Sequence, residues 1–321
     1  MTLPVSIVAL AGGVGGAKLA TGLYHLLSER LSVVVNTGDD FQHWGLSISP
    51  DLDTVLYNLA DIHNPATGWG LADETHQALV MMQRYGAAGW FSLGDRDLAT
   101  HLLRTEKLAA GATLTAVMAE LRAALGIGAA LLPMSDQPVR TLVHSDEGVL
   151  PFQRYFVQRR CEPRLLSLEF SGIEAARPTP QVLAALDRAA AVILCPSNPY
   201  LSLDPILLLP GLAERLRAFR GPVLAVSPIV GGQALKGPAA KIMAELGVEV
   251  SPVAVARHIQ TRIRLDGFVL DTLDAAHAEA IAALGITPLV TDTVMGDLAS
   301  KERLALAALT FCADLRPPAP L

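Results

Sequence analysis

The sequence predicts an α/β protein with a largely parallel sheet and a helical insertion after the second strand. Two observations support this fold class. Short apolar segments alternate along the chain with segments whose apolar residues recur at helical spacing, and this alternation is typical of parallel sheets. In contrast, residues 53–128 contain helical patterns and no convincing strand.

The chain opens with a strand, a glycine-rich turn, a helix and a second strand. Residues 5–10 are apolar and predict a buried strand that runs directly into the glycines of residues 12–16. A helical pattern follows, and residues 32–35 predict the second strand. Asp39 and Asp40 come soon after this strand, at the edge where open α/β sheets bind ligands.

The insertion is predicted to consist of helices. They begin at a cap near Asp51 and continue through residues 72–85, 97–108 and 114–125. Glycines mark breaks near the C-termini of the last three. We therefore assign residues 51–128 to a helical insertion domain, and residues 1–50 and 129–321 to the nucleotide-binding core.

Strand and helix patterns alternate again in the second part of the core. The predicted strands cover residues 130–133, 140–143, 165–169, 191–194, 222–226, 267–270 and 287–290. The predicted helices cover residues 180–188, 211–219, 238–246, 275–284 and 300–313.

The composition excludes several classes of protein. With 321 residues, 51% of them hydrophobic, the chain can bury a large core. No segment approaches the roughly 20 uncharged apolar residues of a membrane helix, and no basic region marks a signal peptide. The net charge of −6 argues against nucleic-acid binding. Three well-separated cysteines without CxxC spacing suit a cytoplasmic protein and give no zinc site.

The glycine-rich turn has the properties of a phosphate-binding loop without matching a familiar motif. Gly13 and Gly15 supply two glycines of the Rossmann pattern G-x-G-x-x-G, but Lys18 stands at the third position. The P-loop pattern also fails, because Leu19 follows Lys18 where serine or threonine is required. Glycines let the backbone approach a phosphate, and a helix N-terminus offers N–H groups to it. A tight turn without a ligand is the alternative.

Four carboxylates lie close together in the sequence near the same sheet edge: Asp39, Asp40, Asp51 and Asp53. Grouped carboxylates are unfavourable unless they bind a cation. Asp51 or Asp53 can cap the following helix, but a cap does not explain all four. The group therefore predicts a metal site. We expect Asp53→Asn to abolish turnover with little loss of stability, on the assumption that the site is exposed.

Four polar, turn-rich segments follow predicted elements, at residues 92–97, 134–139, 195–199 and 227–232. Each can be an ordinary loop, but together they suit recognition of a base, a ribose and phosphates. Arg96 can bind a phosphate bidentately or pair within its own turn. No Ser-His-Asp or Cys-His set stands out, and His101 is expected to be structural.

Seven motifs carry a resemblance to a known family, in matching order and spacing between about residues 5 and 300. They are residues 12–15, 36–40, 49–57, 93–101, 132–136, 196–199 and 225–229. In these the chain resembles the 2-phospho-L-lactate transferases of coenzyme F420 biosynthesis. The resemblance implies a Rossmann-like core with a helical insertion, a homodimer and a Mg²⁺-dependent phosphotransferase of the EC 2.7.8 type.

Members of this family join the deazaflavin Fo (7,8-didemethyl-8-hydroxy-5-deazariboflavin) to a phosphorylated three-carbon acid. The donor is the GDP-linked acid, GMP is released, and F420-0 or dehydro-F420-0 is formed. The acid can be 2-phospho-L-lactate, phosphoenolpyruvate or phosphoglycerate, and no residue of this sequence decides among them. The number of metal ions is equally open. The helical insertion would contribute to the deazaflavin pocket.

The resemblance assigns roles to individual residues. Asp39, Asp40 and Asp53 are the expected catalytic residues and Mg²⁺ ligands, with Asp53 close to the Fo hydroxyl and a candidate base. Ser92 stands where archaeal relatives have a lysine that contacts Fo, so another group must replace that contact. The remaining expected substrate-binding residues are Gly13, Val14, Gly15 and Gly16 for phosphate, Asp95, Arg96 for the acid's carboxylate or a phosphate, and Ser197, Asn198, Ser227 and Gly231 for guanosine.

Two other classes of function remain as alternatives. The YvcK-like nucleotide-sugar-binding regulators share the glycine-rich opening and would bind without catalysis. An NAD-dependent dehydrogenase would place Asp39 or Asp40 on a ribose hydroxyl. The carboxylate group favours the transferase, because neither alternative needs a metal there.

Overall fold

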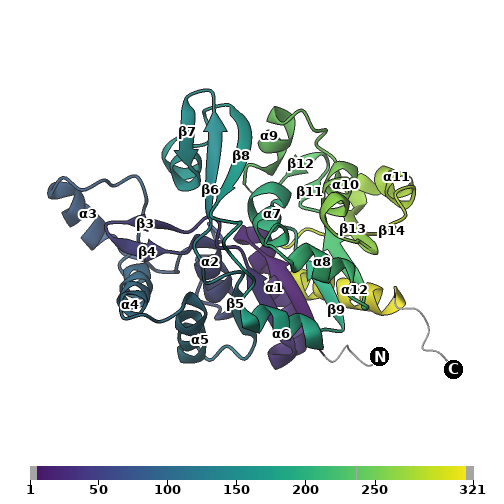
Figure 1. Cartoon of the computed structure of the whole chain (residues 1–321), viewed down its shortest axis with the longest axis horizontal. Helices are drawn as coiled ribbons and strands as arrows, with labels where there is room; N and C mark the ends of the chain where they lie inside the picture. Colours follow the sequence, from purple (N-terminus) through teal and green to yellow (C-terminus); the bar gives the residue numbers. More distant parts are fainter. Residues whose placement is uncertain (1–5, 236, 316–321) are drawn as a thin grey trace.

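A parallel sheet of seven strands forms the centre of the molecule in the computed structural model, which describes residues 6–235 and 237–315 (Figure 1). Val5 of the predicted first strand lies outside the described residues. In spatial order the strands are β14 (Thr287–Thr291), β13 (Gly267–Asp271), β10 (Val223–Val226), β9 (Ala191–Leu194), β1 (Ile7–Ala11), β2 (Leu31–Val35) and β5 (Ala130–Pro133). All neighbouring pairs are parallel, so the predicted Rossmann-like α/β fold is confirmed.

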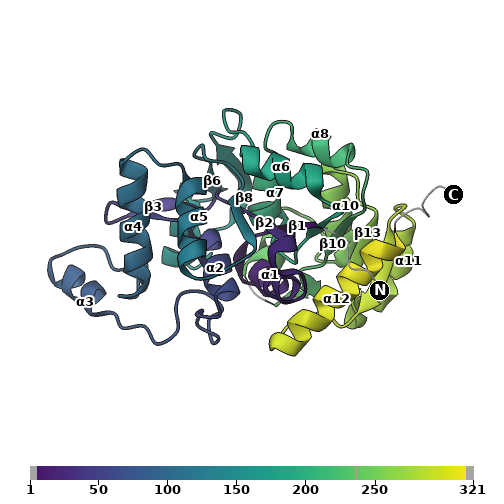
Figure 2. The ribbon, with the colours of Figure 1, turned by 90° about the horizontal axis from the view of Figure 1, so that it is seen from below.

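The strands are apolar throughout because helices cover both faces of the sheet (Figure 2). The helices that pack on one face are α1 (Gly13–Leu27), α2 (Pro50–Leu59), α5 (Leu114–Ala124) and α12 (Leu298–Asp314). The other face is covered mainly by α6 (Pro180–Arg188), α7 (Asp204–Leu207), α8 (Leu212–Arg217), α9 (Ala239–Glu245) and α10 (Pro252–Arg262). The short helix α11 (Ala278–Ala282) lies between β13 and β14 in sequence.

The strand order reverses direction at β1. From β1 the chain proceeds to β2 on one side, whereas β9 pairs with the other side of β1. The loops that follow β1 and β9 therefore leave the sheet at a topological switch point. Ligands of open α/β sheets bind in the crevice at such a point.

The predicted insertion contains three helices besides α2 (Figure 2). Of these, α3 (Gln77–Arg84) and α4 (Asp97–Ala109) extend to one side of the sheet, whereas α5 packs against β5. Helix α3 is shorter than predicted, while α4 and α5 agree closely with the prediction. Helix α2 packs on α1, and its Leu52, Val55 and Leu56 are part of the core. The domain boundaries at residues 50 and 129 stay a prediction.

Several elements were not predicted. A hairpin of β3 (Phe41–His43) and β4 (Leu46–Ile48) closes through Trp44 and Gly45, both at positive φ, as a two-residue hairpin turn requires. Strands this short carry no recognisable period. Helix α10 was also missed.

A second, antiparallel sheet stands above the carboxyl edge of the main one in Figure 1. Its order is β7 (Gly148–Pro151), β6 (Arg140–Ser145) and β8 (Leu165–Ser171). The strands predicted at 140–143 and 165–169 therefore exist but do not join the parallel sheet. A further two-stranded ribbon joins β11 (Ile229–Val230) and β12 (Gln233–Ala234).

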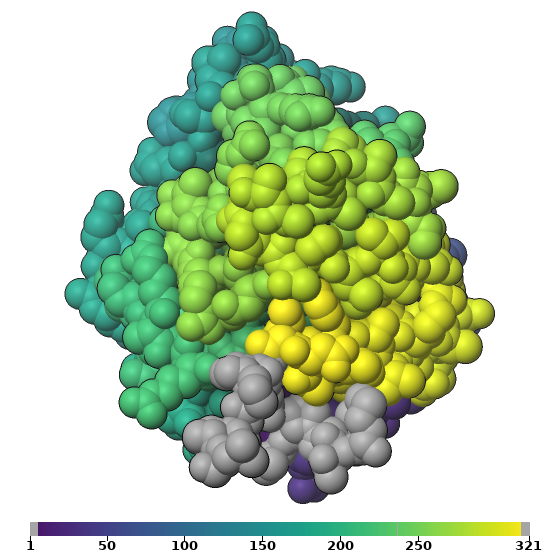
Figure 3. Space-filling view, turned by 90° about the vertical axis from the view of Figure 1, so that its right-hand side faces the viewer, coloured from purple at the N-terminus to yellow at the C-terminus, as the bar shows by residue number. Residues whose placement is uncertain are grey.

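The C-terminal third of the chain forms one end of the molecule, which Figure 3 shows in green and yellow. Helix α12 crosses this end and packs on α1 through Leu304, Ala305 and Ala308. Within residues 6–235 and 237–315, no helix has the length and apolar character needed to span a membrane.

Candidate active site at the carboxyl edge of the sheet

The glycine turn and the loop after β9 contact each other directly at the switch point. The backbone N–H of Gly12 donates to Ser197 Oγ at 3.0 Å, and the Ser197 hydroxyl donates back to the Gly12 carbonyl at 2.9 Å. A Cβ atom on Gly15 would lie 2.3 Å from the carbonyl oxygen of Pro196. Gly15 is therefore needed for loop packing, whatever its role toward a phosphate.

Asp51 lies against the N-terminus of α1. Its Oδ1 accepts from the backbone N–H of Gly13 at 2.8 Å, and its Oδ2 accepts from Asn36 Nδ2 at 2.9 Å. Asn36 in turn accepts from the backbone N–H of Gly38 at 2.7 Å, which orders the turn before Asp39. One of the amides expected to hold phosphate, that of Gly13, thus already has an acidic partner.

Asp39 and Asp40 are buried beside Asp51 with few cationic partners. Burial, followed by the neighbouring charge of Asp51, raises the pKa of Asp39 well above its usual range. Burial raises the pKa of Asp40 to about 7, although a hydrogen bond from Ser49 opposes this shift. Burial also raises the pKa of Asp51 to about 6.

Asp40 retains an unsatisfied oxygen. Ser49 Oγ donates to Oδ2 at 2.8 Å, but Oδ1 is buried and has no hydrogen-bond partner among the described residues. The nearby hydroxyl of Thr37 is buried and unpaired as well. Both residues line a hollow of about 130 Å³ that also reaches Arg140 and Asp136. The structure thus leaves polar atoms at this position that a ligand can satisfy.

Asp53 has a different environment, because a buried arginine neutralises it. Arg104 of α4 is fully buried and donates to both oxygens of Asp53, from Nη1 to Oδ2 at 3.0 Å and from Nη2 to Oδ1. The sequence expectation of an exposed Asp53 is therefore wrong: only 5% of the residue is exposed.

Further residues of α4 continue this arrangement. His101 Nδ1 lies 3.3 Å from Arg104 Nη1, and His101 Nε2 lies 3.3 Å from Asp97 Oδ2. The hydroxyl of Tyr57 donates to Asp97 Oδ1 at 2.6 Å. Although burial opposes it, the contact with His101 keeps the pKa of Asp97 below its usual value.

The buried carboxylates fit a Mg²⁺ site to different degrees. Among the described residues no three His, Cys, Asp or Glu side chains converge on one point. Mg²⁺ commonly uses only one or two carboxylates together with substrate phosphates. The orphaned oxygen of Asp40 and the raised pKa values of Asp39 and Asp40 fit such a site. Asp53 fits less well, because Arg104 already occupies both of its oxygens.

The residues predicted to bind guanosine lie in loops after β9 and β10. Asn198 Oδ1 accepts from the backbone N–H groups of Tyr200 and Leu201, while its Nδ2 is a buried donor without a partner. Ser227 bonds within its own turn to Ile229. The N–H of Gly231 donates to Asp274 at 2.9 Å. Of this set, Asn198 keeps an unused donor.

The residues of the 92–97 segment lie in the arm formed by α3 and α4. Asp95 accepts from the backbone N–H groups of Gln77 and Ala78 and so caps α3. The guanidinium of Arg96 donates to the carbonyl of Ala72 at 2.9 Å, and Ser92 is exposed. Asp95 therefore has a structural role, and Arg96 has a local contact.

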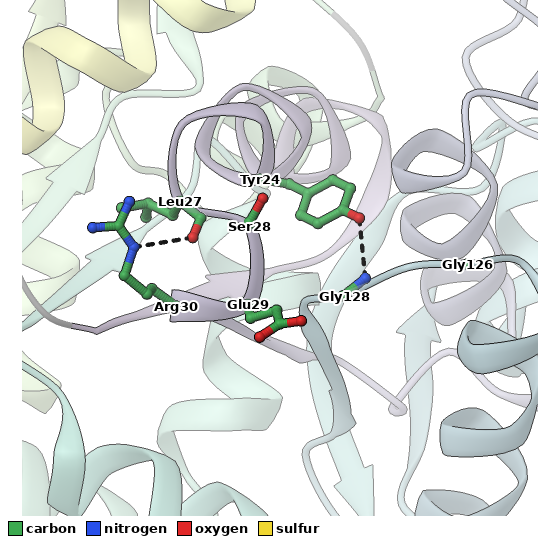
Figure 4. Close-up of a pocket in the computed structure, with 7 residues that line it drawn as sticks. All are labelled: Tyr24, Leu27, Ser28, Glu29, Arg30, Gly126 and Gly128. Carbon is green, nitrogen blue, oxygen red and sulfur yellow. Dashed lines mark hydrogen bonds between the residues drawn. The ribbon is translucent and has the colours of Figure 1, made fainter.

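A larger hollow, of about 480 Å³, lies elsewhere (Figure 4). It is lined by Tyr24, Glu29, Arg30 and the glycines at 126 and 128, beside the start of β2. This is the amino end of the strands, opposite the edge that carries the predicted residues. Tyr24 and Arg30 already bond to neighbouring backbone there, so we do not assign it to the site.

The sequence reading missed the partners of Asp53. Asp97, His101 and Arg104 are spaced i, i+4 and i+7 and share one face of α4, which is a recognisable signal. Nothing in the sequence, however, indicates that this face meets Asp53. Arg140 and Thr141, which approach Asp40 and Asp39 from β6, carry no local signal at all.

Comparison with known proteins gives a consistent family. A family model described as 2-phospho-L-lactate transferase CofD matches residues 7–304. A phosphoenolpyruvate transferase of Streptomyces griseus is 40% identical over 316 residues, covering 97% of this chain and 99% of the relative. A 2-phospho-L-lactate transferase of Methanosarcina mazei is 39% identical over 300 residues, covering 93% and 98%.

The fold also occurs among solved structures. A member of the UPF0052 family from Bacillus halodurans superimposes with a TM-score of 0.64 and covers 96% of this chain and 99% of its own. Its sequence is only 14% identical, so this likeness shows the fold alone. By the family model and the extent of its relatives, the chain belongs to the CofD family of 2-phospho-L-lactate transferases and is a transferase of coenzyme F420 biosynthesis.

Proposed function

We propose that this transferase joins a phosphorylated three-carbon acid, delivered as its GDP-linked form, to the terminal ribityl hydroxyl of Fo. The hydroxyl oxygen attacks the phosphorus that bears the acid. The bond from that phosphorus to the bridging oxygen breaks, GMP leaves with that oxygen, and the hydroxyl proton is released to solvent. The product is F420-0 or its dehydro form.

The single observation that supports this reaction best is the group of buried acids at the switch point. Asp39, Asp40 and Asp51 lie between the glycine turn and β6 with raised pKa values, and Asp40 keeps an unpaired oxygen. Buried carboxylates that lack cationic partners favour binding of a cation. A diphosphate donor needs its negative charge neutralised before a hydroxyl can approach.

Asp39 and Asp40 are the residues that would hold Mg²⁺. When bound, the ion would neutralise charge on the transferred phosphoryl group. The chain itself supplies the positioning: the N-terminus of α1 attracts phosphate, and the unused amide donor of Asn198 is available to a nucleotide base. Asp53, held by Arg104, would accept the hydrogen bond of the attacking hydroxyl.

The decisive experiment supplies purified protein with Fo, Mg²⁺ and each GDP-linked acid in turn, and identifies the products by mass spectrometry. We expect one of the three acids to be used in preference, with GMP formed in equal amount. The similar relatives carry names with two different acids, so the assay must include both and the glycerate form. Binding of the donor without product from any acid would instead favour the regulator class.

A second experiment addresses the nucleotide. Guanine offers an acceptor at O6 and a donor at N1, whereas adenine reverses both. A pocket built for one leaves polar groups unpaired with the other, at about 1–3 kcal/mol each. We expect GDP to stabilise the protein against heat more than ADP or NAD. Equal stabilisation by GDP and ADP would contradict guanosine recognition, and tight NAD binding would favour a dehydrogenase.

We also propose that the protein works as a homodimer, as the family resemblance implies, and in the cytoplasm, as its few, well-separated cysteines suggest. Sedimentation velocity of the purified chain at micromolar concentration measures the oligomeric state, and a monomeric mass would contradict the homodimer. Fractionation of the source cells measures the cellular location.

A further inference from the structure

We infer that Arg104 is a positioning residue for the transfer reaction, acting through Asp53 and anchored by His101 and Asp97. The inference rests on the proposed function, because it concerns the orientation of the group that meets the attacking hydroxyl. None of these three residues was assigned a role by the motifs around Asp53.

Arg104 fixes the plane of the Asp53 carboxylate. Its guanidinium donates to both Asp53 oxygens, and Nη1 also lies 3.3 Å from the carbonyl oxygen of Ser47 in β4. The arginine is completely buried, and Asp53 is 5% exposed. A bidentate contact between two planar groups allows little rotation of either.

His101 and Asp97 hold the arginine from the other side. His101 Nδ1 faces an N–H group of Arg104 at 3.3 Å, so this nitrogen must be the acceptor. The proton of a neutral His101 therefore belongs on Nε2, which lies 3.3 Å from Asp97 Oδ2. Tyr57 completes the chain by donating to Asp97 Oδ1 at 2.6 Å. This series of contacts therefore begins at Asp53 and ends at Tyr57, and both residues lie on α2.

Stability alone gives a poor reason for this arrangement. Burying an ion pair removes two charges from water, and a well-packed apolar pair of similar volume is often as stable or more so. A buried arginine cannot lose its proton, so a permanent positive charge faces both oxygens of Asp53. A carboxylate whose plane is fixed can orient a hydroxyl, because its remaining lone pairs point in set directions.

The contrast with Asp40 adds to the argument. Asp40 lies within electrostatic range of both Arg104 and Asp53. It nevertheless receives no hydrogen bond from Arg104, and its Oδ1 is unpaired. The arginine therefore selects one carboxylate of two, and leaves the other for a different partner.

A double-mutant cycle in the full-length protein tests the inference. The variants are Arg104→Met, Arg104→Lys, Asp53→Asn and the double variant Asp53→Asn/Arg104→Met. Turnover is measured with Fo and the GDP-linked acid that the wild type uses, and kcat is expressed per folded protein as measured by circular dichroism. Lys107→Met is the matched control, since Lys107 lies on the same helix and pairs with exposed Glu120.

We expect Arg104→Met to lower kcat about 100-fold, as small misplacements of reacting groups do, with KM for the donor within about threefold of wild type. Arg104→Lys should recover part of kcat by keeping the charge. The double variant should be no slower than Asp53→Asn alone, since Arg104 then has nothing to position. Lys107→Met should behave as wild type.

Three outcomes would overturn the inference while leaving the proposed function intact. One is wild-type kcat per folded protein in Arg104→Met. Another is a double variant whose loss is the product of the two single losses. The third is unchanged kcat in Asp53→Asn. A wild type that makes no product from any of the three acids would overturn the proposed function itself, so the two failures are distinguishable.

Discussion

Two acidic regions lie side by side at the carboxyl edge of the sheet, and they differ in whether the protein compensates the charge of their carboxylates. On one side, Asp39, Asp40 and Asp51 are buried, form no ion pair within the described part of the chain, and have raised pKa values. On the other side, Asp53 has the buried guanidinium of Arg104 on both oxygens. The two regions are adjacent in sequence and fold, yet only the second has its charge compensated by the protein.

This difference suggests that the first region binds a cation and that Asp53 in the second orients a substrate group. A carboxylate group that the protein leaves uncompensated favours an external cation, or else a proton. A carboxylate that the protein compensates keeps its charge and orientation without any ligand. The sequence predicted one metal site for Asp39, Asp40 and Asp53, whereas the structure divides these acids between two environments.

The largest effect should come from breaking the compensated side. Asp53→Asn leaves Arg104 buried without its carboxylate, and removing one partner of a buried pair costs about 3–5 kcal/mol. The variant should therefore lose both turnover and stability, measured by urea denaturation. If the Asp53→Asn protein is as stable as the wild type, water can replace the contact between Asp53 and Arg104 at no cost in free energy.

The next effect concerns the glycine turn beside the uncompensated side. Gly15→Ala should destabilise the protein by about 1–3 kcal/mol, because its Cβ would lie 2.3 Å from the Pro196 carbonyl. Gly296→Ala is the matched control, since nothing lies within 4 Å of its added Cβ and its φ is ordinary. Equal thermal stability of the two variants would show that the two loops separate easily. A loss of GDP affinity in Gly15→Ala has to be interpreted after correction for folding.

The pH dependence sharpens the comparison further. The pKa values of Asp51 (about 6) and Asp40 (about 7) are raised in the folded, metal-free protein, so protonation of these acids favours folding. This contribution to the free energy of unfolding is fully present below pH 3.8, the pKa of the unfolded state. That stability is lost as the pH rises through about 6 to 7. Mg²⁺ binds the ionised form, so its affinity should rise up to about tenfold per pH unit and per proton released.

Thermal melts with and without Mg²⁺ at pH 5.5 and pH 8 measure this effect. The stabilisation by Mg²⁺ should be larger at pH 8, and Asp40→Asn should reduce the difference between the two pH values. An equal Mg²⁺ effect at both values would contradict cation binding by these acids.

The smallest effect is expected at Asp95, another acid whose contacts are complete. Asp95→Ala removes the hydrogen bonds to the first turn of α3, which should lower the melting temperature by a degree or two. The KM for the donor should not change if Asp95 only caps α3. A raised KM in the folded variant would restore the substrate-binding role that the family resemblance implies.

The predictability of the fold differed between its parts for physical reasons. The parallel strands were recognised because burial on both faces makes them continuous apolar segments. The hairpin of β3 and β4 was missed because three residues are too few to show a period. The strands at 140–143 and 165–169 were recognised, but their own pattern does not reveal which sheet they join.

The candidate site divides in the same manner. Asp39 and Asp40 were noted from their position after a strand, and the family resemblance singled out Asp53. Arg104 is 51 residues from Asp53 along the chain. Its helical spacing with Asp97 and His101 was visible, but the partner of that helix face was not.

The sequence by itself therefore determined the α/β class, the glycine turn at the first strand and the family, because each is encoded locally in residue type and spacing. Only the tertiary structure decided which aspartates are compensated. Packing α4 on β4 brings a buried guanidinium to Asp53, whereas Asp39 and Asp40 meet mainly hydroxyl and amide groups. Charge compensation acts across space between distant segments, and local sequence carries no record of those distances.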